Sequence, residues 1–184
     1  MADDAGNEQR ETLAAAGNSH REQLAPARQA ELQIPISIRV DQPDWNVERM
    51  RAAVAAICLD AGFSCGEISV AIVGSREMQD LHRRYLGDDS PTDVLAFPLA
   101  ASDSRLEGEI IVCWDVAQES ASEFQWRAED ELLLYVVHGA LHLVGLDDTN
   151  ETAFQRMRSA EEKYVGAFGL TLIGRDHSAH PEEC

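Results

Sequence analysis

Hydrophobic and polar residues follow two different periods along the chain, and these periods predict its secondary structure. Apolar side chains occupy every second position between Leu32 and Val40, which predicts a strand, and Pro35 within it favours a sheet edge. Further strands are predicted at residues 67–73, 92–97 and 108–113, with a short one at 170–173. Pro98 is expected to end the strand at 92–97, and residues 100–107 are expected to form a loop.

The helical spacing of apolar residues predicts five helices, at about residues 45–61, 75–86, 115–124, 128–144 and 150–168. Asp44 and Ser75 are expected to cap two of them, and Asp148 or Thr149 the last. The helix at 128–144 begins with acids and is then apolar on nearly all sides, so we expect it to be buried and central. The interleaved order predicts an α+β fold, a single domain with a mixed β-sheet of about four strands packed with about five helices.

The composition predicts one domain between two tails. The chain has 184 residues, 45% of them hydrophobic, and no run of 18 apolar residues, so we expect a sizeable core and no membrane span. Residues 1–31 contain no Ile, Val, Phe, Trp or Tyr and lack a signal peptide's apolar run, which predicts a disordered N-terminal tail. We place the folded domain at residues 32–173 and a C-terminal tail at 174–184. The four cysteines lack metal-site spacing, which favours reduced thiols in a cytoplasmic protein.

The strongest chemical signal is a pair of histidines, His138 and His142, four residues apart within the predicted buried helix. This spacing places both imidazoles on one helix face. Gly145 is expected to end the helix, and Asp148 follows where the chain can fold back and supply a third ligand. Such a set suits Zn²⁺ or a related metal, and three protein ligands leave a position open for water, as in catalytic sites. Alternatively, Asp148 or Asp147 caps the following helix.

The charge balance is strongly acidic. A net charge of −18 argues against binding nucleic acid through bulk electrostatic attraction. Among the 15 basic residues, Lys163 is the only lysine, and the planar guanidinium of arginine suits phosphate. Arg76, Arg83 and Arg84 are spaced to share one face of the predicted helix at 75–86. They form a candidate phosphate-binding patch, although a solvated helix face explains them equally well.

Three motifs give the chain a resemblance to a known family. The YbeY family of endoribonucleases, also called rRNA maturation factors, carries His-Gly-x-Leu-His-Leu-x-Gly-Tyr-Asp-His. Residues 138–148 resemble this motif, with matches at His138, Gly139, Leu141, His142, Leu143, Gly145 and Asp147. Residues 91–98 resemble the family's Pro-Thr-Asp-Val-Leu-Ser-Phe-Pro, and residues 107–110 echo its Leu-Gly-Asp-Ile. The order and spacing of all three agree, and the resemblance covers roughly residues 32–173.

Three positions depart from the family pattern. The family's third metal ligand, a histidine, is Asp148 here, and aspartate retains the site with a harder ligand set. An arginine of the family that is thought to serve RNA binding or catalysis is Leu86 here. The serine of the second motif is Ala96, which we regard as a minor change.

The resemblance implies a metal-dependent endoribonuclease that cleaves single-stranded RNA and acts in rRNA maturation and ribosome quality control. It implies one divalent ion per chain, with Zn²⁺ as the first choice, held by His138, His142 and Asp148. It leaves the catalytic acid and base of this chain unknown. Because the net charge of −18 disfavours tight binding of free RNA, the ribosome or a ribosomal protein is expected to deliver the substrate.

Two other functions stay open at this point. The spacing of His138, His142 and Asp148 also resembles a metalloprotease zinc site of the metzincin type. Such proteases carry a glutamate base directly after the first histidine, whereas Gly139 stands here, so we rank peptidase activity below RNA hydrolysis. The non-enzymatic alternative is a ribosome-assembly factor whose metal only braces the fold, which Leu86 in place of arginine keeps open.

Overall fold

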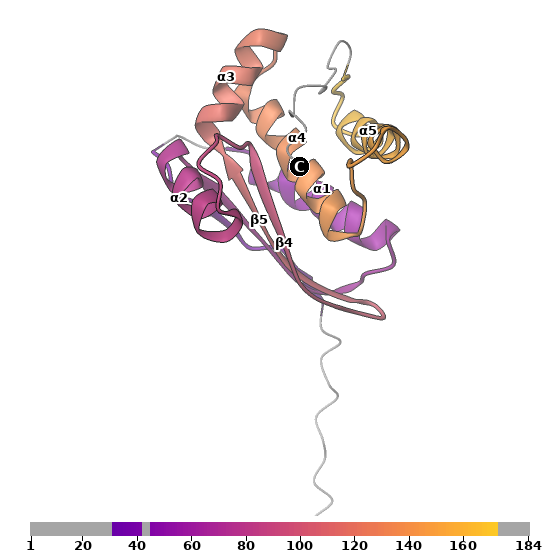
Figure 1. The fold of residues 1–184 in the computed structure, drawn as a ribbon. Coiled ribbons are helices and arrows are strands. Elements are labelled where there is room, and N and C mark those ends of the chain that lie inside the picture. Colours follow the sequence, from indigo (N-terminus) through magenta and orange to yellow (C-terminus); the bar gives the residue numbers. More distant parts are fainter. Residues whose placement is uncertain (1–30, 42–44, 173–184) are drawn as a thin grey trace, which may run out of the picture.

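A computed structural model describes residues 31–41 and 45–172, which form a mixed sheet packed with helices (Figure 1). The strands are β1 (Leu32–Gln33), β2 (Ile36–Ile38), β3 (Cys65–Val73), β4 (Val94–Ser102) and β5 (Arg105–Cys113). The helices are α1 (Val47–Asp60), α2 (Ser75–Leu86), α3 (Trp114–Phe124), α4 (Ala128–Leu143) and α5 (Glu151–Gly166). The predicted α+β class is confirmed. Both predicted tails, apart from Glu31, and the predicted cap Asp44 lie outside the described residues.

The sheet is parallel except at one edge. Its order is β1-β3-β5-β4, and β2 also pairs with β3. Strands β3 and β5 run parallel in one unbroken register, from Cys65 opposite Arg105 to Val73 opposite Cys113. Strand β4 returns antiparallel to β5 and forms the edge. The central strands β3 and β5 are therefore the frame on which the helices pack.

Helices cover the two faces of the sheet unequally. Figure 1 shows α1 and α4 on one side and α2 on the other. Alternate residues of the strands point to each side, as the pleat requires. The α4 side holds the larger core, which includes Ile68, Val70, Ile72, Leu106, Ile110 and Val112. The α2 side holds a smaller one of Ala71, Val73, Met78, Leu95, Ile111 and Cys113.

Three strand predictions were wrong in detail. The strand predicted from Leu32 to Val40 is two short strands, because Pro35 lacks an N–H and contributes only its carbonyl, which accepts from Val70 N at 2.9 Å. Strand β4 continues through Pro98 to Ser102, with a register shift after the proline, so residues 100–107 form a hairpin rather than a loop. A proline is tolerated there because β4 is an edge strand. Residues 170–172 form no strand, and Ile173 lies outside the described residues.

Two predicted helix caps were also wrong. Gly74 precedes α2, and Ser75 is its first helical residue, whose N–H donates to Asp115 Oδ2 at 2.7 Å. Asn150, rather than Asp148 or Thr149, caps α5, because its side chain accepts from Ala153 N at 3.0 Å. Among the described residues, none of the helices has the length and apolar character needed to span a bilayer.

Candidate metal centre

Helix α4 is seated directly on the sheet. Gly139 lies so close to it that an added Cβ would meet Ile110 Cγ2 at 2.8 Å and Val94 Cγ2 at 3.0 Å. One turn further on, the side chain of Leu143 packs against Gly108 of β5, where an added Cβ would meet Leu143 Cδ1 at 2.8 Å. Such contacts leave no space for the helix to slide or rotate. The other side chains of α4, including His138 and His142, are therefore held at fixed positions.

The end of α4 folds the chain back toward its own last turn. Gly145 takes the left-handed conformation, with φ of +94°, which favours glycine. Leu146 N then donates to Leu141 O at 3.0 Å, and the carbonyl of Leu146 comes to lie beside His142. Asp148 follows this turn and, because Asn150 caps α5, its carboxylate is available to the histidines.

Three donor atoms converge at this helix end. His138 and His142 face each other with their Nε2 atoms 2.8 Å apart, and Asp148 Oδ2 lies 3.8 Å from His138 Nε2. The ligand atoms of the three residues lie within 4.8 Å of one another, and all three residues are half-buried. Tetrahedral ligands at zinc distances would lie about 3.3 Å apart, between these two separations. The structure thus brings together the three residues that the sequence predicted.

The second nitrogen of each imidazole has its own partner. A carbonyl oxygen only accepts, so His142 Nδ1 carries a proton and donates to Leu146 O at 3.0 Å. His138 Nδ1 lies 2.7 Å from Glu161 Oε1 and donates to that carboxylate. With both Nδ1 atoms protonated, the two Nε2 atoms, 2.8 Å apart, are left to share a proton or a metal ion between them. The donor set therefore fits a metal ion.

The two histidines differ in their electrostatic surroundings. Burial lowers the pKa of His138, but the hydrogen bond and charge of Glu161, together with the charges of Asp93 and Asp148, outweigh it and raise that pKa above its usual value. Burial and the neighbouring His138 lower the pKa of His142. The carboxylates around the donors thus favour a positive charge at this position, whether a proton or a metal ion carries it.

Sequence reasoning missed Glu161 and its partner Arg158. Glu161 is only 5% exposed and belongs to the buried stripe of α5, between Met157 and Val165. An acid at a position where helical spacing calls for an apolar residue was the available signal. That signal marks a buried carboxylate but does not tell which residue it contacts.

The predicted arginine patch lies away from the histidines. Arg76, Arg83 and Arg84 are exposed on α2, which covers the opposite face of the sheet from α4 (Figure 1). Arg83 pairs with Asp80 at 2.5 Å and Asp89 at 3.4 Å, so acids partly neutralise its charge. Leu86, which stands in place of the family arginine, is 62% exposed at the end of the same helix.

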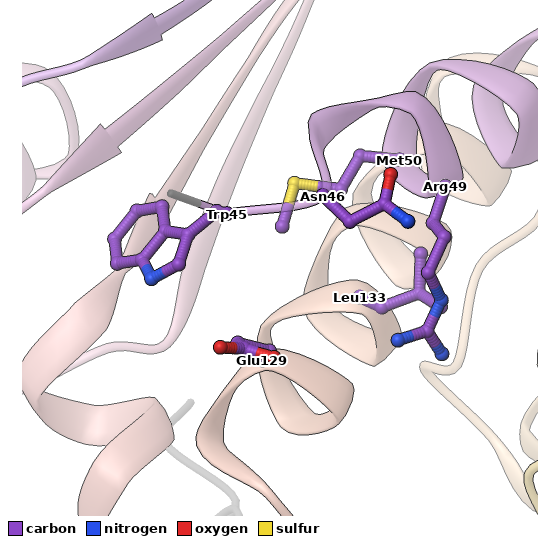
Figure 2. A pocket seen from close by; sticks show the side chains of 6 residues that line it. All are labelled: Trp45, Asn46, Arg49, Met50, Glu129 and Leu133. Carbon is purple, nitrogen blue, oxygen red and sulfur yellow. The ribbon is translucent and has the colours of Figure 1, made fainter. Parts of the chain in front are cut away.

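A small pocket near the start of α4 is a poor candidate for a substrate site. Figure 2 shows it between α1 and α4, lined by Trp45, Asn46, Arg49, Met50, Glu129 and Leu133. Its volume of about 10 Å³ holds one water molecule at most.

The cysteines offer no second metal site. Cys58, Cys65 and Cys113 are free thiols, and the group of His138, His142 and Asp148 is the one cluster of metal-binding residues in the part of the chain that the structure describes.

Known proteins resemble this chain over most of its described length. The family model of Endoribonuclease YbeY matches residues 36–169. An Endoribonuclease YbeY from Carboxydothermus hydrogenoformans is 40% identical, over 72% of this chain and 92% of the relative. Another, from Rhodopirellula baltica, is 36% identical over 75% and 72%. A solution structure of TM1509 from Thermotoga maritima aligns with a TM-score of 0.53 and 29% identity, over 78% of this chain and 99% of that one. The chain therefore belongs to the endoribonuclease YbeY family of RNA-cleaving hydrolases.

Proposed function

We propose that this chain is a metal-dependent endoribonuclease that cleaves single-stranded RNA, with His138, His142 and Asp148 as the ligands of one divalent ion. The observation that carries the proposal is the convergence of these three donors within 4.8 Å at the end of a rigidly seated helix. Membership of the family supports RNA as the substrate.

The donor set favours Zn²⁺. Two imidazole nitrogens and one carboxylate oxygen are common zinc ligands, and three of them leave the coordination shell open. When bound, the ion supplies Lewis-acid chemistry, which acidifies water and offsets charge on a phosphodiester. The protein's part is to fix the donors: the sheet holds α4 through Gly139, and Leu146 O and Glu161 hold the two imidazole rings.

Gly139 argues against peptidase chemistry. Zinc peptidases of this spacing place a glutamate base directly after the first histidine. Here that position faces the sheet, where even a Cβ atom would lie 2.8 Å from Ile110 Cγ2. A glutamate would have neither room nor a path to the donors.

We also propose a biological setting, which membership of the family and the charge of the chain support. We place the functional domain at residues 32–173 and its work in the cytoplasm, in rRNA maturation and ribosome quality control. Arg76, Arg83 and Arg84 are our candidates for phosphate contacts. Because the net charge is −18, the ribosome or a ribosomal protein is the partner expected to present the RNA.

Metal removal tests the proposal. The purified chain is treated with a chelator, dialysed and assayed on an end-labelled single-stranded RNA, with and without added Zn²⁺, while circular dichroism follows folding. We expect cleavage to vanish while the domain stays folded, and to return with Zn²⁺. His142→Ala should reduce metal content to near background and abolish cleavage.

Two other results would point elsewhere. Undiminished cleavage without metal, or wild-type metal content in His142→Ala, would refute the assignment. Unfolding of the domain on chelation would favour the assembly factor in which the ion only braces the fold.

A further inference from the structure

Glu161 is the most deeply buried charged group beside the three donors. It projects from α5 toward α4, and its Oε1 atom lies 2.7 Å from His138 Nδ1. The residue is 5% exposed and shares the buried stripe of α5 with Met157 and Val165. Glu161 thus links helix α5 to His138.

The carboxylate is itself held in place. Arg158, one turn earlier on α5, places its Nη1 atom 3.5 Å from Glu161 Oε2. The guanidinium is anchored in turn, because its Nη2 atom donates to Leu172 O at 2.7 Å. His138, Glu161, Arg158 and the backbone at Leu172 therefore form one continuous chain of contacts behind the donors.

Packing alone does not explain an acid at this position. A leucine or methionine would complete the stripe of α5 without the cost of removing a carboxylate from water. Burying the ion pair of Glu161 and Arg158 gives little net stability compared with apolar side chains of similar size. The energetic cost points to a role that needs the negative oxygen itself, and that oxygen points at His138 Nδ1.

From these contacts we infer that Glu161 is a positioning residue for His138, an inference that rests on the proposed metal site. By accepting from Nδ1–H, it selects the tautomer whose Nε2 lone pair points at the donor cluster, and it fixes the plane of the ring. Leu146 O performs the same task for His142. Arg158 keeps the Glu161 carboxylate in the orientation that His138 requires.

The test compares Zn²⁺ affinities, measured by competition with a chromophoric chelator. Glu161→Ala should bind Zn²⁺ about 10–100-fold more weakly than the wild-type chain. Glu161→Gln keeps the size and one accepting oxygen, so its loss should be smaller. Glu162→Ala is the matched control, because Glu162 is the next residue on α5 and is exposed. Its Zn²⁺ affinity should equal that of the wild type.

A spectroscopic measurement separates positioning from a purely structural role. Long-range ¹H–¹⁵N spectra of the metal-free chain, recorded at alkaline pH where the imidazole is neutral, report which nitrogen of His138 carries the proton. We expect Nδ1–H in the wild type and in Glu162→Ala, and a shift toward Nε2–H in Glu161→Ala. If Glu161→Ala lowers only the unfolding temperature, with unchanged Zn²⁺ affinity and tautomer, the inference is overturned. A wild-type chain that binds no Zn²⁺ would instead remove the proposed metal site, and this inference with it.

Discussion

The two faces of the sheet differ in how they are covered, and the difference separates the two candidate sites. On one face, α1 and α4 bury a large core. Helix α4 packs closely on the sheet there, with Gly139 against the side chains of Ile110 and Val94, and with Leu143 against Gly108 of β5. On the other, α2 covers a small core, against which Val116 of α3 also packs. The histidines belong to the helix of the first face and the predicted arginine patch to the helix of the second.

This difference matches what each kind of site requires. Metal ligands must hold positions to within a few tenths of an ångström, and a helix locked against a dry core provides that. Phosphate contacts need long, exposed cations that adapt to a flexible strand, and an exposed helix face offers them. The face with the large core is thus suited to hold a metal ion for catalysis, whereas the face covered by α2 is suited at most to contact RNA phosphates.

The largest expected effect comes from breaking the close packing of the first face. Gly139→Val would place atoms within 3 Å of Ile110 and Val94 side chains, so the helix must shift. We expect the free energy of unfolding to fall by about 3 kcal/mol, as in other overpacked cores. Urea unfolding of the metal-free chain measures it.

Gly166→Val is the matched control for this change. Gly166 is also helical, at the end of α5, but nothing lies within 4 Å of an added Cβ. If Gly139→Val proves as stable as Gly166→Val, then α4 is not locked against the sheet, and the sheet does not fix the metal donors.

The large-core face was also the part that the sequence predicted best. Helix α4 is apolar on nearly all sides, which allows only a buried position, and the i, i+4 histidines place themselves on one side of it. Glu161 escaped prediction because its partner, His138, lies 23 residues away, and helical spacing carries no information about such contacts. Pro98 was misjudged because a proline ends a central strand but is tolerated at an edge, and the position of β4 in the sheet is a tertiary fact.

A smaller effect is expected at the exposed rim of the metal centre. Asp148 is the donor outside α4, and its side chain is 34% exposed. Asp148→His replaces a carboxylate by the neutral imidazole that the family carries there. We expect Zn²⁺ affinity to stay within about tenfold, roughly 1.4 kcal/mol, with RNA cleavage retained. Chelator competition and the RNA assay measure the two.

Asp148→Ala serves as the comparison, because it removes the third donor without offering another. It should bind Zn²⁺ clearly more weakly than either the wild type or Asp148→His. Loss of both metal binding and cleavage in a folded Asp148→His would mean that residue 148 is not at a ligand position, or that the loop cannot seat the larger ring.

The smallest expected effect tests the face covered by α2. Arg83 is already paired with Asp80 and Asp89, so the patch offers RNA less positive charge than its sequence suggests. Arg83→Ala/Arg84→Ala should weaken binding of single-stranded RNA and lower the slope of log affinity against log salt by about 0.7 for each phosphate group that the variant no longer binds. Metal content should not change, because α2 lies across the sheet from the histidines (Figure 1).

Arg105→Ala, which removes an exposed arginine at the start of β5, is the control for a general reduction of positive charge. Equal affinity and an equal salt slope in the double variant and the wild type would exclude this patch. The RNA phosphates would then have to be bound by Arg49 or Arg51 of α1, on the same side of the sheet as the metal centre, or by a partner.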